Sequence, residues 1–253
     1  MISIVTATYN RANTLQRTID SVLKQTLQDW ELIIVDDGST DDTHSVLERL
    51  TDPRIRVVSH SSNRGVCAAK NTGLNNIRGD WFAILDSDDE LVPAALERLM
   101  HCAEETGATA VNCHARDFVS GECTGTGFGD GGWVSAKQAA QTRGDHWGIT
   151  STSLLRNRRL DEQLPGFETT LWLKIDAEAN RYFIPEALLV VHTEGMDRMS
   201  RQPWNLRRRV RMWSRVGEDK EYLAALRRAN LKAYCRVVWR VAVMRLLSPF
   251  LRA

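Results

Sequence analysis

The sequence predicts an α/β fold, with a mostly parallel sheet flanked by helices and a basic helical extension behind it. Strand-like and helix-like segments alternate four times within about the first 100 residues. Two of the strands run directly into turns rich in carboxylates. The charge is also divided: residues 198–253 hold 15 Lys and Arg against 3 Asp and Glu, a net +12, whereas residues 1–197 carry −11. We therefore expect a main domain over residues 1–200 and a basic amphipathic extension over 201–253.

The first four strands are predicted from short, β-branched runs that are bounded by polar turns. These runs are residues 2–8, 31–35, 55–59 and 81–85. Apolar residues at helical spacing predict helices over 14–27, 42–50 and 66–77, and Pro93 opens a further helix. Because strands and helices alternate, the strands are expected to be parallel, with ligands bound beyond their carboxyl ends.

Beyond Gly107 the pattern is less regular. It predicts strands over residues 110–113, 117–120 and 187–192, and a helix over 171–179. The six glycines between residues 121 and 132 indicate a mobile loop. From Trp204 onward the sequence is typical of two or three basic helices.

Composition favours a globular protein of a reducing compartment. Hydrophobic residues make up 43% and charged residues 26% of the chain. The five cysteines form no Cys-x-x-Cys pair, which indicates incidental thiols. The N-terminus shows no secretory signal pattern, and no run of 18 apolar residues predicts a spanning helix.

The acidic turn after the fourth strand carries the strongest chemical signal. Asp86, Asp88 and Asp89 place three carboxylates within four residues, where they repel one another unless a cation joins them. Mg²⁺ and Mn²⁺ prefer such oxygen ligands and often bridge to substrate phosphates. The alternative is a helix start, where Asp is also favoured. Asp36 and Asp37 end the second strand, so both acidic turns are expected at one crevice.

Four motifs in order resemble those of glycosyltransferase family 2. They are TATYNR at 6–11, VDDGSTD at 35–41, NRG at 63–65 with AKNTG at 69–73, and DSDD at 86–89. The resemblance is close over residues 1–100, which it implies to be the nucleotide-sugar-binding half, and looser over 101–200, the acceptor-side half. It implies a GT-A fold, an inverting reaction and a nucleoside-diphosphate sugar donor, by default a UDP-sugar.

The resemblance also implies site residues. Donor binding is assigned to Ala7, Tyr9, Asp36, Asp37, Lys70, Asp86, Ser87, Asp88 and Arg198. Mn²⁺ or Mg²⁺ is assigned to Asp88, Asp89 and His192. An inverting transfer needs a general base for the acceptor hydroxyl. Where the family usually carries an acidic pair before an apolar-Trp helix, this chain has Glu168 alone, with Asp161 and Glu162 as alternatives. A first-turn Glu that favours the helix dipole is the structural alternative.

The basic extension is expected to contact an anionic membrane surface, because it combines arginines with tryptophans on amphipathic helices. Packing on the main domain is the alternative, and no nucleic-acid motif accompanies the basic residues. The resemblance to the family implies a glycan or lipid-linked acceptor in bacterial polysaccharide or lipopolysaccharide synthesis. It also implies that the protein is cytoplasmic and acts at the inner face of the cell membrane. Two other functions compete with this one. The first is a sugar nucleotidyltransferase, which is disfavoured because residues 6–14 lack the glycines of a phosphate-binding loop. The second is a non-catalytic, membrane-associated relative.

Overall fold

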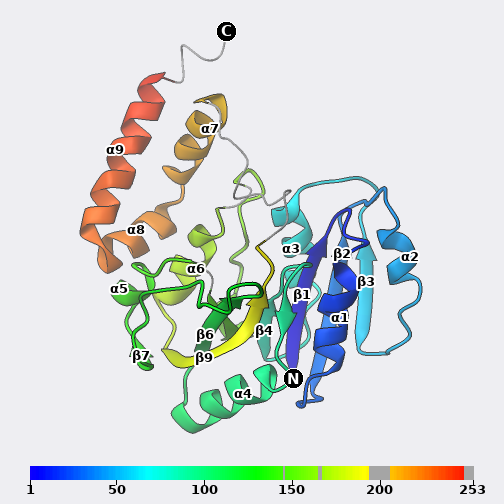
Figure 1. Ribbon diagram of the computed structural model, residues 1–253. Helices are drawn as coiled ribbons and strands as arrows, with labels where there is room; N and C mark the ends of the chain where they lie inside the picture. The colour runs from blue at the N-terminus through cyan, green and yellow to red at the C-terminus, as the bar shows by residue number, and fades with distance from the viewer. Residues whose placement is uncertain (145, 165–166, 194–205, 248–253) are drawn as a thin grey trace.

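A computed structural model describes residues 1–144, 146–164, 167–193 and 206–247. Within these ranges one mixed sheet runs through the molecule in the order β3-β2-β1-β4-β8-β6-β9-β5, with β7 paired to β9 (Figure 1). Helices cover the sheet, and three further helices stand beside it at the C-terminal end of the chain. The predicted α/β class is therefore confirmed.

The N-terminal half is the parallel part of the sheet. β1 (Ile2–Thr8) lies between β2 (Trp30–Asp36) and β4 (Trp81–Ile84), and β3 (Ile55–Ser59) pairs with β2. The three early helices are α1 (Leu15–Leu23), α2 (Thr43–Leu47) and α3 (Val66–Leu74). The predicted strands over 2–8 and 55–59 are confirmed to the residue, while the helices end three or four residues earlier than predicted.

The second half of the sheet mixes directions. β8 (His146–Ser151) is antiparallel to both β4 and β6 (Ala110–Asp117), whereas β9 (Arg181–Val191) is parallel to β6. The short strands β5 (Glu90–Leu91) and β7 (Gly132–Val134) pair antiparallel with β9. Helix α4 (Ala95–Thr106) precedes β6, and α5 (Ala136–Ala139), the 3₁₀ turn Thr152–Leu154 and α6 (Thr169–Asp176) complete this half.

Several predictions for this half were wrong in detail. A strand was predicted over 117–120, but β6 ends at Asp117 and a turn follows, because the Asp117 carboxylate accepts the amides of Val119 and Ser120. β7 and β8 were not predicted. The predicted strand over 187–192 is the last part of the longer β9.

Alternating side chains of β1 and β2 build a core on each face of the sheet. Ile4 and Leu32 pack into the cluster beneath α1 and α4, whereas Val5 and Ile33 pack into the cluster beneath α3 and α6. Gly73 lets α3 lie against β1, since a Cβ there would stand 2.2 Å from Cγ1 of Val5. This close approach fixes the position of α3, which carries Lys70.

The C-terminal helices are α7 (Leu206–Val216), α8 (Lys220–Ala229) and α9 (Leu231–Leu247), drawn in orange and red in Figure 1. Their inner faces form a third apolar cluster that includes Trp213, Tyr222 and Leu226 and reaches Leu173 of α6. Part of the extension therefore packs on the main domain. Among the described residues we find no helix with the length and apolar character that crossing a bilayer requires.

Candidate active site

The loops at the carboxyl ends of β1 and β2 are tied together. The Asn10 amide donates to Oγ of Ser39 (2.9 Å), and the Thr40 amide donates to Oδ1 of Asn10 (2.8 Å). Asn10 adopts a φ of 54°, in the left-handed region that Asn tolerates better than most residues. These bonds hold the two loops as one rim at the edge of the sheet.

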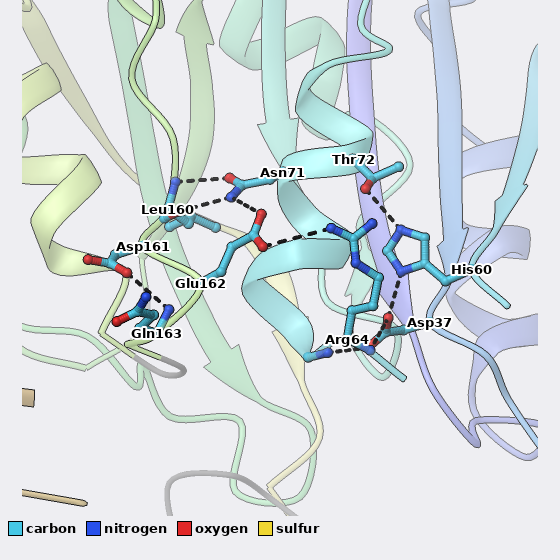
Figure 2. A network of polar contacts seen from close by, with 10 residues as sticks. Asp37, His60, Arg64, Asn71, Thr72, Leu160, Asp161, Glu162 and Gln163 are labelled. Atoms are coloured by element: carbon cyan, nitrogen blue, oxygen red, sulfur yellow. Dashed lines mark hydrogen bonds and ion pairs between the residues drawn. The ribbon is translucent and has the colours of Figure 1, made fainter. Parts of the chain in front are cut away.

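The carboxylates of Asp36 and Asp37 are buried and bound within this rim. Asp36 accepts hydrogen bonds from the amide and hydroxyl of Ser39. Asp37 accepts the backbone amides of Arg64 (2.9 Å) and Gly65 (2.7 Å) and lies 2.7 Å from Nδ1 of His60 (Figure 2). Asp36 thus shapes the loop after β2 and Asp37 the loop that begins α3, and a contact of either with a donor base stays a prediction.

The residues predicted to line the base pocket lie beside this rim. Ala7 is half-buried near the end of β1, and the Tyr9 ring is 42% exposed just beyond it. An exposed aromatic ring at the carboxyl edge of a parallel sheet is available for stacking with a planar ligand. That role of Tyr9 remains a prediction.

The acidic turn after β4 is held through its backbone. Thr14 Oγ1 donates to the carbonyl of Ser87 (3.1 Å), and the Arg17 guanidinium donates to the carbonyl of Asp88 (2.7 Å). Thr14 and Arg17, at the start of α1, therefore contact the turn through its backbone.

Lys70 connects this turn with Glu168, the predicted general base. Its Nζ lies 2.8 Å from Oδ1 of Asp86 and 2.6 Å from Oε1 of Glu168. Lys70 is only 4% exposed, and burial alone would lower the pKa of its ammonium, but the charges and hydrogen bonds of the two carboxylates raise that pKa well above its usual range. Three predicted site residues from three separate elements thus meet in one ion-paired cluster.

A cavity of about 440 Å³ opens over this cluster. The lining of the cavity includes the charged residues Lys70, Asp86, Asp89 and Glu168 and the aromatic residues Trp147 and Trp172. Trp147 donates from Nε1 to the carbonyl of Ile84 (2.8 Å), while the Trp172 ring stacks on Phe82. Flat aromatic walls beside charged groups suit a ligand with both apolar faces and hydroxyls, such as a sugar.

The acidic turn has the donor chemistry of a Mg²⁺ or Mn²⁺ site. Asp86, Asp88 and Asp89 offer only carboxylate oxygens, and the Asp86 side chain is 57% exposed at the cavity. Within the described ranges, no group of three His, Cys, Asp or Glu side chains is gathered closely enough to hold an ion alone. A cation here would take its remaining ligands from a bound phosphate group or water, as Mg²⁺ usually does.

His192, predicted as a metal ligand, lies at the end of β9. Its Nε2 is 2.7 Å from Oε1 of Glu90, and its ring stacks on Phe118. Metal binding through Nε2 would require the pair with Glu90 to open. Arg198, predicted to face the leaving diphosphate, lies outside the described residues.

The alternative bases lie in other surroundings. Glu162 accepts a hydrogen bond from Nδ2 of Asn71 (3.1 Å), as Figure 2 shows, and Asp161 pairs with Nε of Arg215 (2.7 Å). Both lie among ion pairs next to α3 and α7 and do not line the cavity that holds Lys70. The geometry therefore favours Glu168 over either residue.

Sequence reasoning assigned no role to His60 or His146. His60 directly follows β3, and functional groups often lie at the carboxyl ends of parallel strands, so its position was a signal that could have identified it. Its ring lies between the Asp37 carboxylate and Oγ1 of Thr72. His146 lines the cavity from β8, a strand that was not predicted. Burial, together with the charges of the nearby His114 and Arg181, lowers the pKa of His146 to about 4.

Comparison with known proteins places this geometry in a family. The family model "Glycosyl transferase family 2" matches residues 3–164. A similar curated protein is the GalNAc(5)-diNAcBac-PP-undecaprenol beta-1,3-glucosyltransferase of Campylobacter jejuni, 34% identical over 189 residues. The match covers 72% of this chain and 61% of that relative, so the chain spans less than two thirds of the relative's length.

Solved structures share the fold. Staphylococcus aureus TarS 1-349 in complex with UDP-GlcNAc aligns with a TM-score of 0.77 at 18% identity, over 98% of this chain and 72% of that one. The mannosyltransferase PcManGT from Pyrobaculum calidifontis, in complex with GDP-Man and Mn²⁺, aligns with a TM-score of 0.64 at 21% identity, over 99% and 75%. The GT-A fold implied by the four motifs is confirmed.

We predict that Lys70→Met destabilises the protein by about 2–3 kcal/mol, because it leaves two carboxylates facing each other without their cation. Urea unfolding at neutral pH measures this change. Arg98→Met, which removes the cation of an exposed pair with Glu186, is the control and is expected to cost less than about 1 kcal/mol. Adding Glu168→Gln to Lys70→Met should restore part of the lost stability. Equal destabilisation by Lys70→Met and by the control Arg98→Met would contradict the central role of Lys70.

A second prediction concerns pH. The folded-state pKa of His146, about 4, lies below its ordinary value of 6.5, so the unfolded chain binds the proton first as pH falls. His146 therefore lowers stability progressively from about pH 6.5 to about pH 4, by about 3 kcal/mol in total. His146→Phe should remove that part of the pH dependence in urea unfolding, whereas His44→Gln, at an exposed site, should leave it unchanged. Identical pH profiles for wild type and His146→Phe would refute the assignment.

Proposed function

Because this chain belongs to glycosyl transferase family 2, we propose that it is an inverting transferase that moves a sugar from a UDP-sugar to a glycan or lipid-linked acceptor. The cluster of Lys70, Asp86 and Glu168 beneath one cavity is the observation that carries the proposal. The acceptor class follows the Campylobacter jejuni relative, whose name specifies a sugar chain on undecaprenol diphosphate. We place the reaction in bacterial cell-surface polysaccharide or lipopolysaccharide synthesis.

Glu168 acts as the general base in this proposal. Its carboxylate takes the proton of an acceptor hydroxyl, the hydroxyl oxygen forms a bond to the anomeric carbon, and the bond from that carbon to the diphosphate oxygen breaks. The base and the leaving group lie on opposite faces of the sugar, so the configuration inverts. UDP departs with the electron pair of the broken bond.

The other residues hold the reactants. Lys70 fixes the Glu168 carboxylate relative to Asp86, so that the base and the donor side keep a constant separation. Asp86, Ser87 and Asp88 would face the donor, and Ala7 and Tyr9 would contact its nucleotide base. Asp88 and Asp89 would hold Mn²⁺ or Mg²⁺. When bound, the cation supplies positive charge that stabilises the departing diphosphate.

The surface of α9 supports a place at the inner face of the cell membrane, reached from the cytoplasm. Trp239 and Leu246 are 66% and 74% exposed, and Leu231 and Val238 lie exposed along the same helix. The helix contains no Asp or Glu. An exposed apolar row with basic neighbours is the pattern of a helix that lies in an anionic bilayer surface.

Donor binding is expected to be visible as thermal stabilisation. UDP with Mn²⁺, at about 100 times its Kd, should raise the Tm by roughly 5–10 °C, because it binds only the folded state. The shift should exceed those with GDP, dTDP or CMP, and EDTA should reduce it. Asp88→Ala should lose the part that depends on Mn²⁺.

The same panel separates the competing functions. A Tm shift that is equal with and without Mn²⁺, or unchanged in Asp88→Ala, would contradict the metal assignment. Release of pyrophosphate from a nucleoside triphosphate would indicate a nucleotidyltransferase instead. UDP binding with no hydrolysis or transfer of any nucleotide sugar would indicate a non-catalytic relative.

If Glu168 is the general base, its replacement should lower turnover without weakening donor binding. Glu168→Gln should lower kcat by about 100-fold or more while UDP–Mn²⁺ binding stays within about twofold, because only the proton transfer is lost. Glu162→Gln is the matched control and should keep kcat near the wild-type value. If Glu162→Gln is the inactive variant, the base has been misassigned.

A further inference from the structure

A second hollow, of about 730 Å³, lies where α5 and the loop after it meet the turn between α8 and α9. Figure 1 shows α5 beside α8 and the start of α9. Among the described residues, six cations and no carboxylate line the hollow; the cations are Lys137, Arg143, Arg227, Arg228, Lys232 and Arg236. We define these residues as the basic hollow.

These six cations differ from several other basic side chains of the fold, which form ion pairs. Arg98, Arg158 and Arg215 each pair with a glutamate or aspartate on another element. In the described part of the chain, by contrast, no ion pair joins a member of the basic hollow to a carboxylate. Gathering like charges in one concave place costs free energy unless an anion occupies it. The hollow therefore has the chemistry of an anion site.

The basic hollow is continuous with the catalytic cavity. Ala140, Thr142 and Arg143 line both. The backbone of Arg143 is fixed to Thr126 by two hydrogen bonds, of 2.8 and 3.0 Å, so this shared edge has a defined position. An anionic group bound in the hollow would be next to whatever sugar occupies the cavity.

An apolar surface begins at the other side of the hollow. Leu231 belongs to its lining and is itself exposed at the start of α9. From there the exposed apolar row continues along α9 through Val238 and Trp239 to Leu246. A ligand spanning these surfaces would have a sugar in the cavity, an anionic group in the hollow and an apolar chain over α9.

We propose that the basic hollow binds the diphosphate of a lipid-diphosphate-linked acceptor. This inference rests on the proposed function, because it takes the sugar in the cavity to be the acceptor. Guanidinium groups match phosphate oxygens with paired hydrogen bonds, and two phosphates account for a site with several arginines better than one carboxylate would. The hollow thereby selects acceptors whose sugar is joined to lipid through a diphosphate.

The test uses two probes with the same sugar. One is GlcNAc diphosphate that carries a short alkyl chain, and the other is GlcNAc joined to the same chain without phosphate. Binding is measured by isothermal titration with UDP and Mn²⁺ in excess, so that the donor site is already filled. The variant is Arg228→Gln with Lys232→Gln, and the control is Arg209→Gln with Arg211→Gln, which removes the same charge from exposed positions on α7 outside the hollow.

Wild type and control should bind the diphosphate probe more tightly than the uncharged one, and the variant in the hollow should bind the diphosphate probe roughly tenfold more weakly. Its affinity for the uncharged probe and for UDP should not change. Equal affinity of variant and control for the diphosphate probe would overturn the inference while UDP binding still upholds the proposed function. Absence of UDP binding in the wild type would instead contradict the proposed function.

Phospholipid headgroups carry related chemistry, and vesicles separate them from the acceptor. Wild type, variant and control are each sedimented with phosphatidylcholine vesicles, with and without phosphatidylglycerol. We expect variant and control to lose vesicle binding equally, since both remove two charges from the extension. If the variant alone loses vesicle binding and keeps its affinity for the diphosphate probe, the hollow is a headgroup site and the acceptor assignment is wrong.

Discussion

The buried ammonium of Lys70 is the interaction on which the site depends. It joins Asp86, just after β4, to Glu168, at the start of α6, although Glu168 lies 98 residues after Lys70 in the chain. Burying a lysine is unfavourable by itself, and only the two carboxylates make it favourable. The same three residues thereby lock the two halves of the fold at a defined separation. Gly73 contributes indirectly, because it lets α3 approach β1 closely enough for Lys70 to reach both partners.

Carboxylates at the edge of the sheet serve two purposes that a sequence motif does not distinguish. Asp36, Asp37 and Asp41 accept hydrogen bonds from loop amides or hydroxyls and so build the rim itself. Asp86, in contrast, is exposed at the cavity, and the turn around it is held by α1 through backbone carbonyls. The Asp86 carboxylate also pairs with Lys70, so it takes part in the ion-paired cluster and, in the proposed function, faces the donor.

The basic extension likewise has two faces. Its apolar inner face, with Trp213 and Tyr222, packs against α6, so the extension is part of the folded unit. Its outer face carries the exposed row of α9 and four cations of the basic hollow, which are Arg227, Arg228, Lys232 and Arg236. Part of the charge excess visible in the sequence therefore lies beside the cavity that holds Lys70. In the proposed function, this location brings the membrane surface and the lipid-linked acceptor together.

The sequence alone determined the parallel half of the fold and the placement of its acidic turns. Strands buried on both faces, such as residues 2–8, are short runs of mostly apolar or β-branched residues, and parallel topology brings their carboxyl ends to one edge. Only the tertiary structure decided the rest. β8 is short, carries polar residues and is defined by its neighbours β4 and β6, so His146 and Trp147 had no local signal. The Lys70 cluster and the basic hollow form between residues far apart in the chain, where contact depends on packing and not on sequence spacing.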